Sequence, residues 1–268
     1  MNFRKGIAGT LAGVAALAVV SVAAADVVSG ELTLRRLNDP NDPPAGLTHA
    51  VMDDTYVRTP GQGGDNFGTS ADLWIDIDND RWSLIAFTNL FDVLPSVNQD
   101  GLTLQIDSAT LTGATRFHGG SPVVQVHRAT TNWLLKDPGD NATTVTGNHI
   151  DPDAEITWAD GAFSDADYTA ENMASLHLPS DPGWHAPVDF DVTALVRDMY
   201  EAGENLGFVM TNEPEAGFYG IRSSRHGTEG VRPTLSIEYS YIPEPASVTL
   251  LGAGLGLMLV RRRRTRVG

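Results

Sequence analysis

The chain has 268 residues, no cysteine and a formal net charge of −16 at pH 7. Without cysteine it can form no disulfide, no thiol nucleophile and no cysteine-ligated zinc site. Seven of the 18 Lys and Arg residues, but only one of the 34 acidic residues, lie outside residues 26–242, so this central part carries a charge near −22 and is expected to repel nucleic acid.

The N-terminal segment has the pattern of a secretory signal peptide. Two basic residues precede the almost wholly apolar stretch 7–22. Ala23 and Ala25 then provide a small-x-small cleavage site. We expect residues 1–25 to form a signal helix that is removed on export.

Residues 26–46 and 47–242 are expected to form a strand with a loop and then the main folded domain. Short runs rich in β-branched and aromatic residues alternate with turn signals, which is typical of a sandwich or barrel. The expected strands are 31–37, 55–57, 72–77, 82–87, 103–112, 123–128, 175–178, 188–190, 207–210, 218–221 and 234–239.

Two other segments stand apart from these strands. Apolar residues at positions 192, 195, 196 and 199 have helical spacing, and Asp191 and Gly203 are suited to cap the two ends of one short helix.

The acidic segment 136–172 has little periodicity, and we expect it to form an excursion over one end or face of the sheets.

The C-terminal segment combines a short motif, an apolar run and a basic cluster. Residues 246–260 are apolar or small, and a helix of that length rises about 22 Å against roughly 30 Å of hydrocarbon in a bilayer. Arginines that follow an apolar helix stay on the cytoplasmic side. The motif residues are Pro243, Glu244 and Pro245, and the cluster is Arg261, Arg262, Arg263 and Arg264.

This stretch, 243–268, resembles the PEP-CTERM sorting signal. The resemblance implies export to the cell surface or extracellular matrix and processing by an exosortase-type protease. With the signal peptide, it also implies transient contact with the inner membrane through both ends of the chain.

The central part contains a series of short pieces that match one family in order. They are 54–57, 66–70, 84–87, 108–111, 126–130 with Trp133, 157–158, 191–196, 205–208 and 232–235. With these pieces the chain resembles the DNRLRE family of secreted β-sandwich domains. The resemblance implies an all-β, jelly-roll-like sandwich with one short helix, flanked here by the signal helix and the C-terminal hydrophobic helix. Some relatives look like carbohydrate-binding modules.

Aromatic residues give the candidate glycan-binding site. An indole offers a flat face to sugar C–H groups, and all five tryptophans, Trp74, Trp82, Trp133, Trp158 and Trp184, could do so; the alternative for each is core packing. In a strand at 73–77, Trp74 and Asp76 point to the same side. We therefore expect glycan contacts from Trp74, Asp76 and Trp82.

The acidic cluster Asp76, Asp78 and Asp80 is the candidate metal site. Calcium prefers several oxygen ligands, so Ca²⁺ is the one candidate cofactor. The cluster does not follow the EF-hand pattern, since Arg81 stands where that loop needs glycine. The alternative is a solvated hairpin tip.

Catalysis has little support in the sequence. The chain has no G-x-S-x-G nucleophile elbow and no H-E-x-x-H zinc motif. Arg222, Arg225 and Arg232 could bind a carboxylated sugar or pair with nearby acids. We expect a non-catalytic exported protein that binds extracellular polysaccharide; the alternatives are a structural matrix or adhesion component without a defined ligand, and a polysaccharide lyase or hydrolase.

Overall fold

The computed structural model describes residues 28–59, 63–94, 98–99, 102–179, 183–214 and 217–243. The expected signal helix, the C-terminal hydrophobic helix and the motif residues Glu244 and Pro245 lie outside these residues. Within the described ranges, no helix combines the length and hydropathy needed to cross a bilayer.

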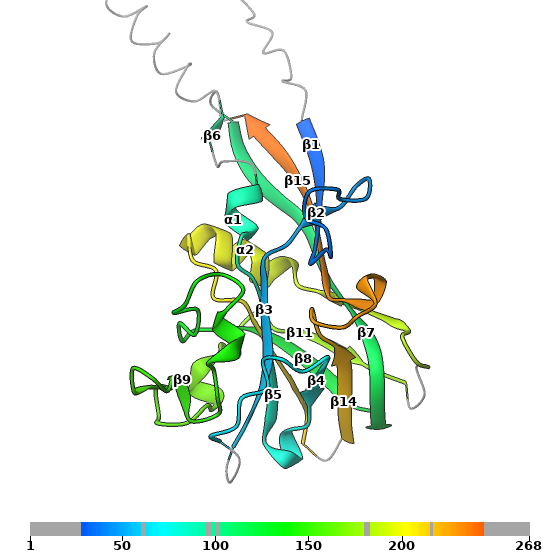
Figure 1. Cartoon of the computed structure of the whole chain (residues 1–268). Coiled ribbons are helices and arrows are strands. Elements are labelled where there is room, and N and C mark those ends of the chain that lie inside the picture. The colour runs from blue at the N-terminus through cyan, green and yellow to red at the C-terminus, as the bar shows by residue number, and fades with distance from the viewer. Residues whose placement is uncertain are drawn as a thin grey trace, which may run out of the picture.

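The described chain is mostly β and forms two large sheets with few helices (Figure 1). The larger sheet contains, in spatial order, β2 (Thr48–His49), β1 (Val28–Arg35), β15 (Thr234–Pro243), β7 (Leu102–Gly120), β14 (Gly217–Arg222) and β4 (Asp72–Ile75), with β12 (Pro187–Asp191) and β6 (Asn98–Gln99) also paired to β7. The second sheet contains β11 (Ala174–His177), β8 (Val123–Arg128), β13 (Phe208–Asn212), β5 (Arg81–Phe87) and β3 (Met52–Arg58). The expected all-β class is thus confirmed, and each expected strand is present.

One hydrophobic core lies between the two sheets. Alternate residues of each strand point into it, for example Leu235 and Ile237 from β15 and Phe208 and Met210 from β13. This period-two pattern is what one buried face requires of a strand. The core therefore fixes which side chains remain on the outer faces.

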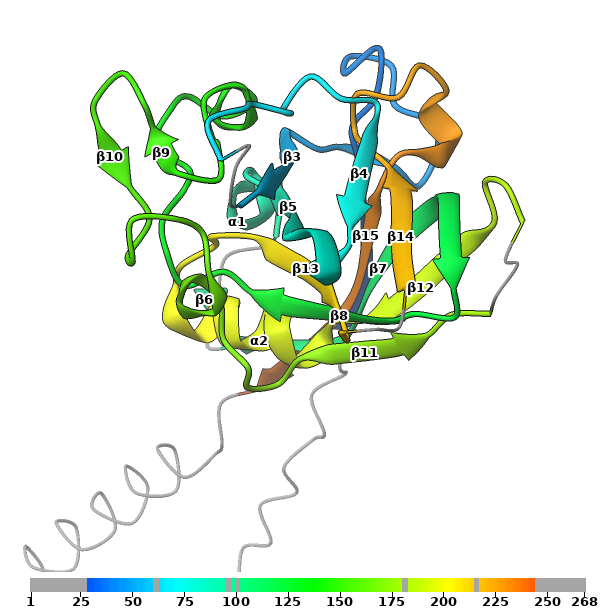
Figure 2. The same ribbon diagram turned by 90° about the horizontal axis from the view of Figure 1, so that it is seen from below.

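In the second sheet, β5 and β13 are buried on both faces. The segment between β8 and β11 folds over its outer side and contains β9 (His149–Asp151) and β10 (Ile156–Thr157) (Figure 2). Its Trp133 and Trp158 are 1% and 2% exposed and pack with Val57, Leu84 and Val209 in a second cluster. The expected excursion is therefore confirmed, and it explains why β5 and β13 are apolar on both sides.

A buried carboxylate fastens the excursion to the second sheet. Asp53 of β3 is fully buried and accepts hydrogen bonds from the backbone N–H groups of Gly139 (2.9 Å) and Ala142 (3.1 Å) and from Asn141 Nδ2 (2.8 Å). Buried polar groups that are left without partners cost free energy, so these three bonds favour this position of the loop.

The expected helix is α2 (Thr193–Ala202), and Leu195, Val196 and Met199 form its buried stripe. Gly203 ends it in the left-handed conformation, as expected. Asp191 accepts a hydrogen bond from the N–H of Thr193 (3.1 Å), although the cap position itself is one residue later, at Val192. The short helix α1 (Leu90–Val93) was not expected.

Candidate functional site

The outer face of the larger sheet carries a group of aromatic and arginine side chains on β4, β14 and the second half of β7. On β4, Leu73 and Ile75 are buried in the core, so Asp72 and Trp74 point outward. On β14, Tyr219 and Ile221 are buried likewise, which places Phe218, Gly220 and Arg222 on the outer side.

A β-bulge in β7 adds one more cation to this face. Phe117 pairs with Gly220 and Thr115 with Ile221, so Arg116 is the extra residue between two paired positions. A bulge re-aims side chains beside it. Arg116 consequently shares the outer face with Phe117, which it contacts through its guanidinium, with Cζ 5.3 Å from the ring centroid.

The rings meet because the strand between them carries a glycine. Trp74 and Phe117 both pair with Gly220 across β14, and their ring centroids are 3.7 Å apart. A Cβ atom at position 220 would overlap the Phe117 ring. Phe218 lies at the side of the pair, 6.1 Å from Trp74.

Two arginines contact the rings of this group, Arg81 at the start of β5 and Arg116 on β7. Arg81 Cζ lies 4.8 Å from the Trp74 ring centroid, and Arg116 Cζ lies 4.4 Å from that of Trp184. We call the connected series Arg81, Trp74, Phe117, Arg116 and Trp184 the aromatic–arginine stripe. Cations over aromatic faces at these distances attract the rings by about 0.5–1 kcal/mol each at exposed sites.

Trp184 is the exposed end of the stripe. Its side chain is 69% exposed, the largest value among the exposed large hydrophobic residues that the structure describes. Gly183 and His185 on either side have positive φ angles of 79° and 58°. Two backbone bonds with Thr115 of β7, from His185 N (2.9 Å) and to Ala186 O (2.9 Å), hold the turn against the sheet edge.

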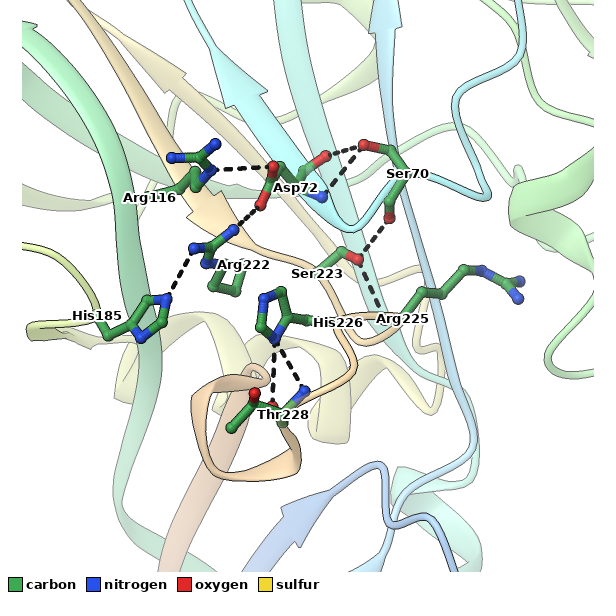
Figure 3. Close-up of polar contacts among 9 residues, drawn as sticks. All are labelled: Ser70, Asp72, Arg116, His185, Arg222, Ser223, Arg225, His226 and Thr228. Carbon is green, nitrogen blue, oxygen red and sulfur yellow. Dashed lines mark hydrogen bonds and ion pairs between the residues drawn. The ribbon is translucent and has the colours of Figure 1, made fainter.

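A polar network lies beneath this exposed end (Figure 3). Asp72 accepts hydrogen bonds from Arg116 Nε (3.2 Å) and Arg222 Nη1 (2.7 Å). Arg222 Nη2 lies 2.7 Å from His185 Nε2, and because arginine only donates, the imidazole nitrogen is the acceptor of this bond. The network thus fixes both the Arg116 guanidinium and the turn that carries Trp184.

Hydrogen bonds of the two residues that follow Arg222 hold the loop after β14 in place. Ser223 Oγ donates to Ser70 O (2.6 Å), and Asp54 accepts from the N–H (2.5 Å) and Oγ (2.9 Å) of Ser224. Burial raises the pKa of the Asp54 carboxyl, and the Ser224 bonds oppose that shift. The His226 ring lies 5.9 Å from the His185 ring, at the rim of the network (Figure 3).

Of the expected glycan-binding residues, only Trp74 belongs to the stripe, and it is half-buried by Phe117 and Arg81. The expectation for Trp82 needs correction. Its side chain is 7% exposed and packs on Phe163 under the excursion, with ring centroids 5.4 Å apart. An indole in that position offers no face to a ligand.

The acidic cluster does not form a cation site in this structure. Asp76 is 4% exposed and binds Asn79 Nδ2 (2.8 Å) and, more weakly, Arg81 (3.9 Å). Asp80 ends a short 3₁₀ turn in the left-handed conformation. No group of three or more His, Asp or Glu side chains in the described ranges could hold a metal ion.

The three late arginines separate in the structure. Arg222 enters the network beneath the stripe, whereas Arg225 Nη2 donates to Gly139 O (3.3 Å) in the excursion. Arg232 donates to the carbonyls of His226 and Arg36, both at 2.9 Å, and to Asn38 Oδ1 (2.6 Å). The last two arginines therefore tie loops together.

A groove of about 710 Å³ lies elsewhere, between α2 and the first residues of β7. Leu104, Ile106, Tyr200 and Ile242 contribute apolar surface to it, and Glu201 is the one carboxylate among its lining residues. Glycoside hydrolysis by the usual route needs two carboxylic residues across the bond. This groove does not supply them.

Sequence reasoning missed Arg116 and did not single out Trp184. A bulge leaves no mark in the alternation of residues, so nothing indicated the outward position of Arg116. The Gly183-Trp184-His185 turn had a weak signal, a glycine directly before a tryptophan in a segment with few apolar residues.

Compared with known proteins, the chain matches no protein-family model and no curated protein.

Proposed function

We propose that this chain is an exported, non-catalytic protein of the cell surface or extracellular matrix that binds polysaccharide along the aromatic–arginine stripe. The observation that carries the proposal is the stripe itself, in which three rings and two guanidinium groups form one connected outer surface. No calcium ion is part of this proposal, because the carboxylates at 76–80 are not gathered.

The chemistry of the stripe suits a sugar polymer. Indole and phenyl faces pack on sugar C–H groups, and guanidinium N–H groups donate to hydroxyl or carboxylate oxygens. The surface lies on an open sheet face, where a long chain can pass, whereas small ligands are usually enclosed in a cavity. The resemblance of short sequence pieces to the DNRLRE family supports a binding role in the same way.

Export is proposed from the ends of the sequence. The signal-peptide pattern of 1–25 and the PEP-CTERM-like pattern of 243–268 both imply passage across the inner membrane and contact with an exosortase-type protease. Cell fractionation tests this: the full-length chain should be found outside the inner membrane, and a chain lacking 7–22 should remain in the cytosol.

The binding proposal is tested with a panel of polysaccharides in affinity gels. The full-length chain should be retarded by at least one polymer, and Trp184→Ala should weaken this by about tenfold, which corresponds to about 1.4 kcal/mol. Met173→Ala is the matched control, because Met173 is also exposed, at 43%, but lies outside the stripe. Retardation by no polymer, or equal retardation of Trp184→Ala and the wild type, would refute the proposal and favour a structural role without a ligand.

A further inference from the structure

The hairpin formed by β9 and β10 is an exposed, acidic projection of the excursion. Residues 152–157 are all exposed, and its tip carries Asp153 and Glu155. Ile156 beside them is 41% exposed and adds an aliphatic side chain to the tip. Glu155 has φ 55°, so the tip is a tight, defined turn.

The excursion as a whole has a large excess of negative charge. Lys136, its one basic residue, is already paired with Asp151 at 2.5 Å. The exposed acids of the excursion are Asp137, Asp140, Asp153, Glu155, Asp160, Asp165 and Glu171. The hairpin tip therefore presents carboxylates and one aliphatic group, and the one basic side chain of the excursion, Lys136, is bonded to Asp151 at the base of the hairpin.

The stripe has the complementary composition. Beside the exposed ring of Trp184, two guanidinium groups, those of Arg116 and Arg222, share the single carboxylate of Asp72, which leaves an excess of positive charge there. Carboxylates pair with guanidinium groups, and an aliphatic side chain packs on an aromatic face. A partner for the hairpin tip is thus present on every copy of the chain.

The two surfaces lie on different sheets and do not meet within one molecule. The excursion covers the outer side of the second sheet, whereas the stripe lies on the outer side of the larger sheet (Figures 1 and 2). Contacts between two different patches are heterologous, and when the rotation does not close they extend into filaments.

We propose that copies of this chain associate head to tail, with the β9–β10 hairpin tip of one copy docked on Trp184 and Arg116 of the next. Asp153 and Glu155 face the guanidinium group and Ile156 packs on the indole ring. The contact is small, so it is weak and is screened by salt. It does not depend on polysaccharide binding, although a polymer on the stripe would compete with it.

Sedimentation velocity of the full-length chain in a non-ionic detergent tests the proposal. The wild type should form a ladder of species that grows with protein concentration and shrinks at high salt. A stripe variant, Trp184→Ala, and a tip variant, Asp153→Asn with Ile156→Asn, should each sediment as the smallest species. Because all variants keep both chain ends, any association through the ends is common to them and does not affect the comparison.

Mixing the two variants gives the decisive result. The stripe variant keeps an intact tip and the tip variant an intact stripe, so an equimolar mixture should form a one-to-one heterodimer and nothing larger. The proposal is overturned if the wild type stays at the smallest species at all concentrations, if either variant still forms the ladder, or if the mixture does not associate. Circular dichroism and thermal melting confirm that the exposed substitutions leave the fold intact.

Discussion

Gly220→Ala is the sharpest test of how the sheet shapes the stripe. The new Cβ would overlap the Phe117 ring, and since carbon atoms pack at about 3.5–4 Å, the ring must move by roughly 1 Å or more. Phe117 is half-buried and the atoms that meet the new Cβ belong to its ring, at the end of the side chain, so it can swing outward instead of straining the strand. The substitution should therefore separate Phe117 from Trp74 without unfolding the protein.

The expected magnitudes follow from two opposing effects. Replacing a strand glycine by alanine stabilises the folded protein by about 0.5–1 kcal/mol, because the unfolded chain loses conformational entropy. Losing an aromatic pair lowers the free energy of unfolding by about 0.5–1.5 kcal/mol. The free energy of unfolding should then change by less than about 1 kcal/mol, or about 2–4 °C in Tm. Polysaccharide affinity should fall by about tenfold, because two of the three rings of the stripe lose their shared surface.

The measurements are urea unfolding followed by tryptophan fluorescence, and retardation in affinity gels. Gly113→Ala on β7 is the matched control, because a Cβ there would meet Ile221 at an ordinary 3.4 Å. Unchanged affinity for Gly220→Ala would show that the Trp74–Phe117 pair does not take part in binding. A loss of several kcal/mol in stability would show that the ring cannot move as argued.

Three further predictions concern stability. Asp53→Asn should lower the free energy of unfolding by about 2–4 kcal/mol, because an amide cannot accept all three bonds from the excursion; a change below about 0.5 kcal/mol in urea would contradict this. Trp82→Ala removes a buried ring and should lower the free energy of unfolding by about 3–5 kcal/mol, while the polysaccharide affinity of the folded fraction stays unchanged. A loss of affinity would show that Trp82 does take part in binding. Hydrogen bonds from Thr193 lower the pKa of Asp191 in the folded protein. The contribution of Asp191 to the free energy of unfolding is therefore fully present above the unfolded pKa of about 3.9 and is lost as pH falls through the lower folded value. Asp191→Asn should accordingly reduce stability at neutral pH more than at strongly acidic pH, and an equal loss at both would refute the assignment.

The strands could be predicted because burial of one face leaves a period-two pattern. The length of β7 could not, since the expectation stopped at residue 112 and the strand continues to Gly120 past a bulge. The two-residue strands β2, β6 and β10 leave no pattern at all, because two residues have no period.

The candidate site was predictable only in part, for a physical reason in each case. Trp82 follows the pattern of a surface hairpin in sequence, but the excursion buries the outer side of β5 and with it this residue. Asp76 was expected to share a strand face with Trp74, yet the strand ends at Ile75 and Asp76 begins a 3₁₀ turn instead. Local sequence records neither the cover supplied by a distant segment nor the residue at which a strand ends.

The pairing of β1 with β15 has a mechanical consequence. Val28 lies opposite Tyr241, so the chain enters and leaves the domain at the same end. Leu102 of β7 pairs with Pro243 at that end. Phe117 lies 15 residues further along β7, a path of about 50 Å. Suppose that the molecule is held at its C-terminal end while a ligand bound to the stripe pulls on β7. The force then acts along the strands and is shared by the ten residue pairs between β15 and β7, which are loaded in shear. The same force applied between the two ends would instead peel β1 from β15 one pair at a time, which yields at a much lower load.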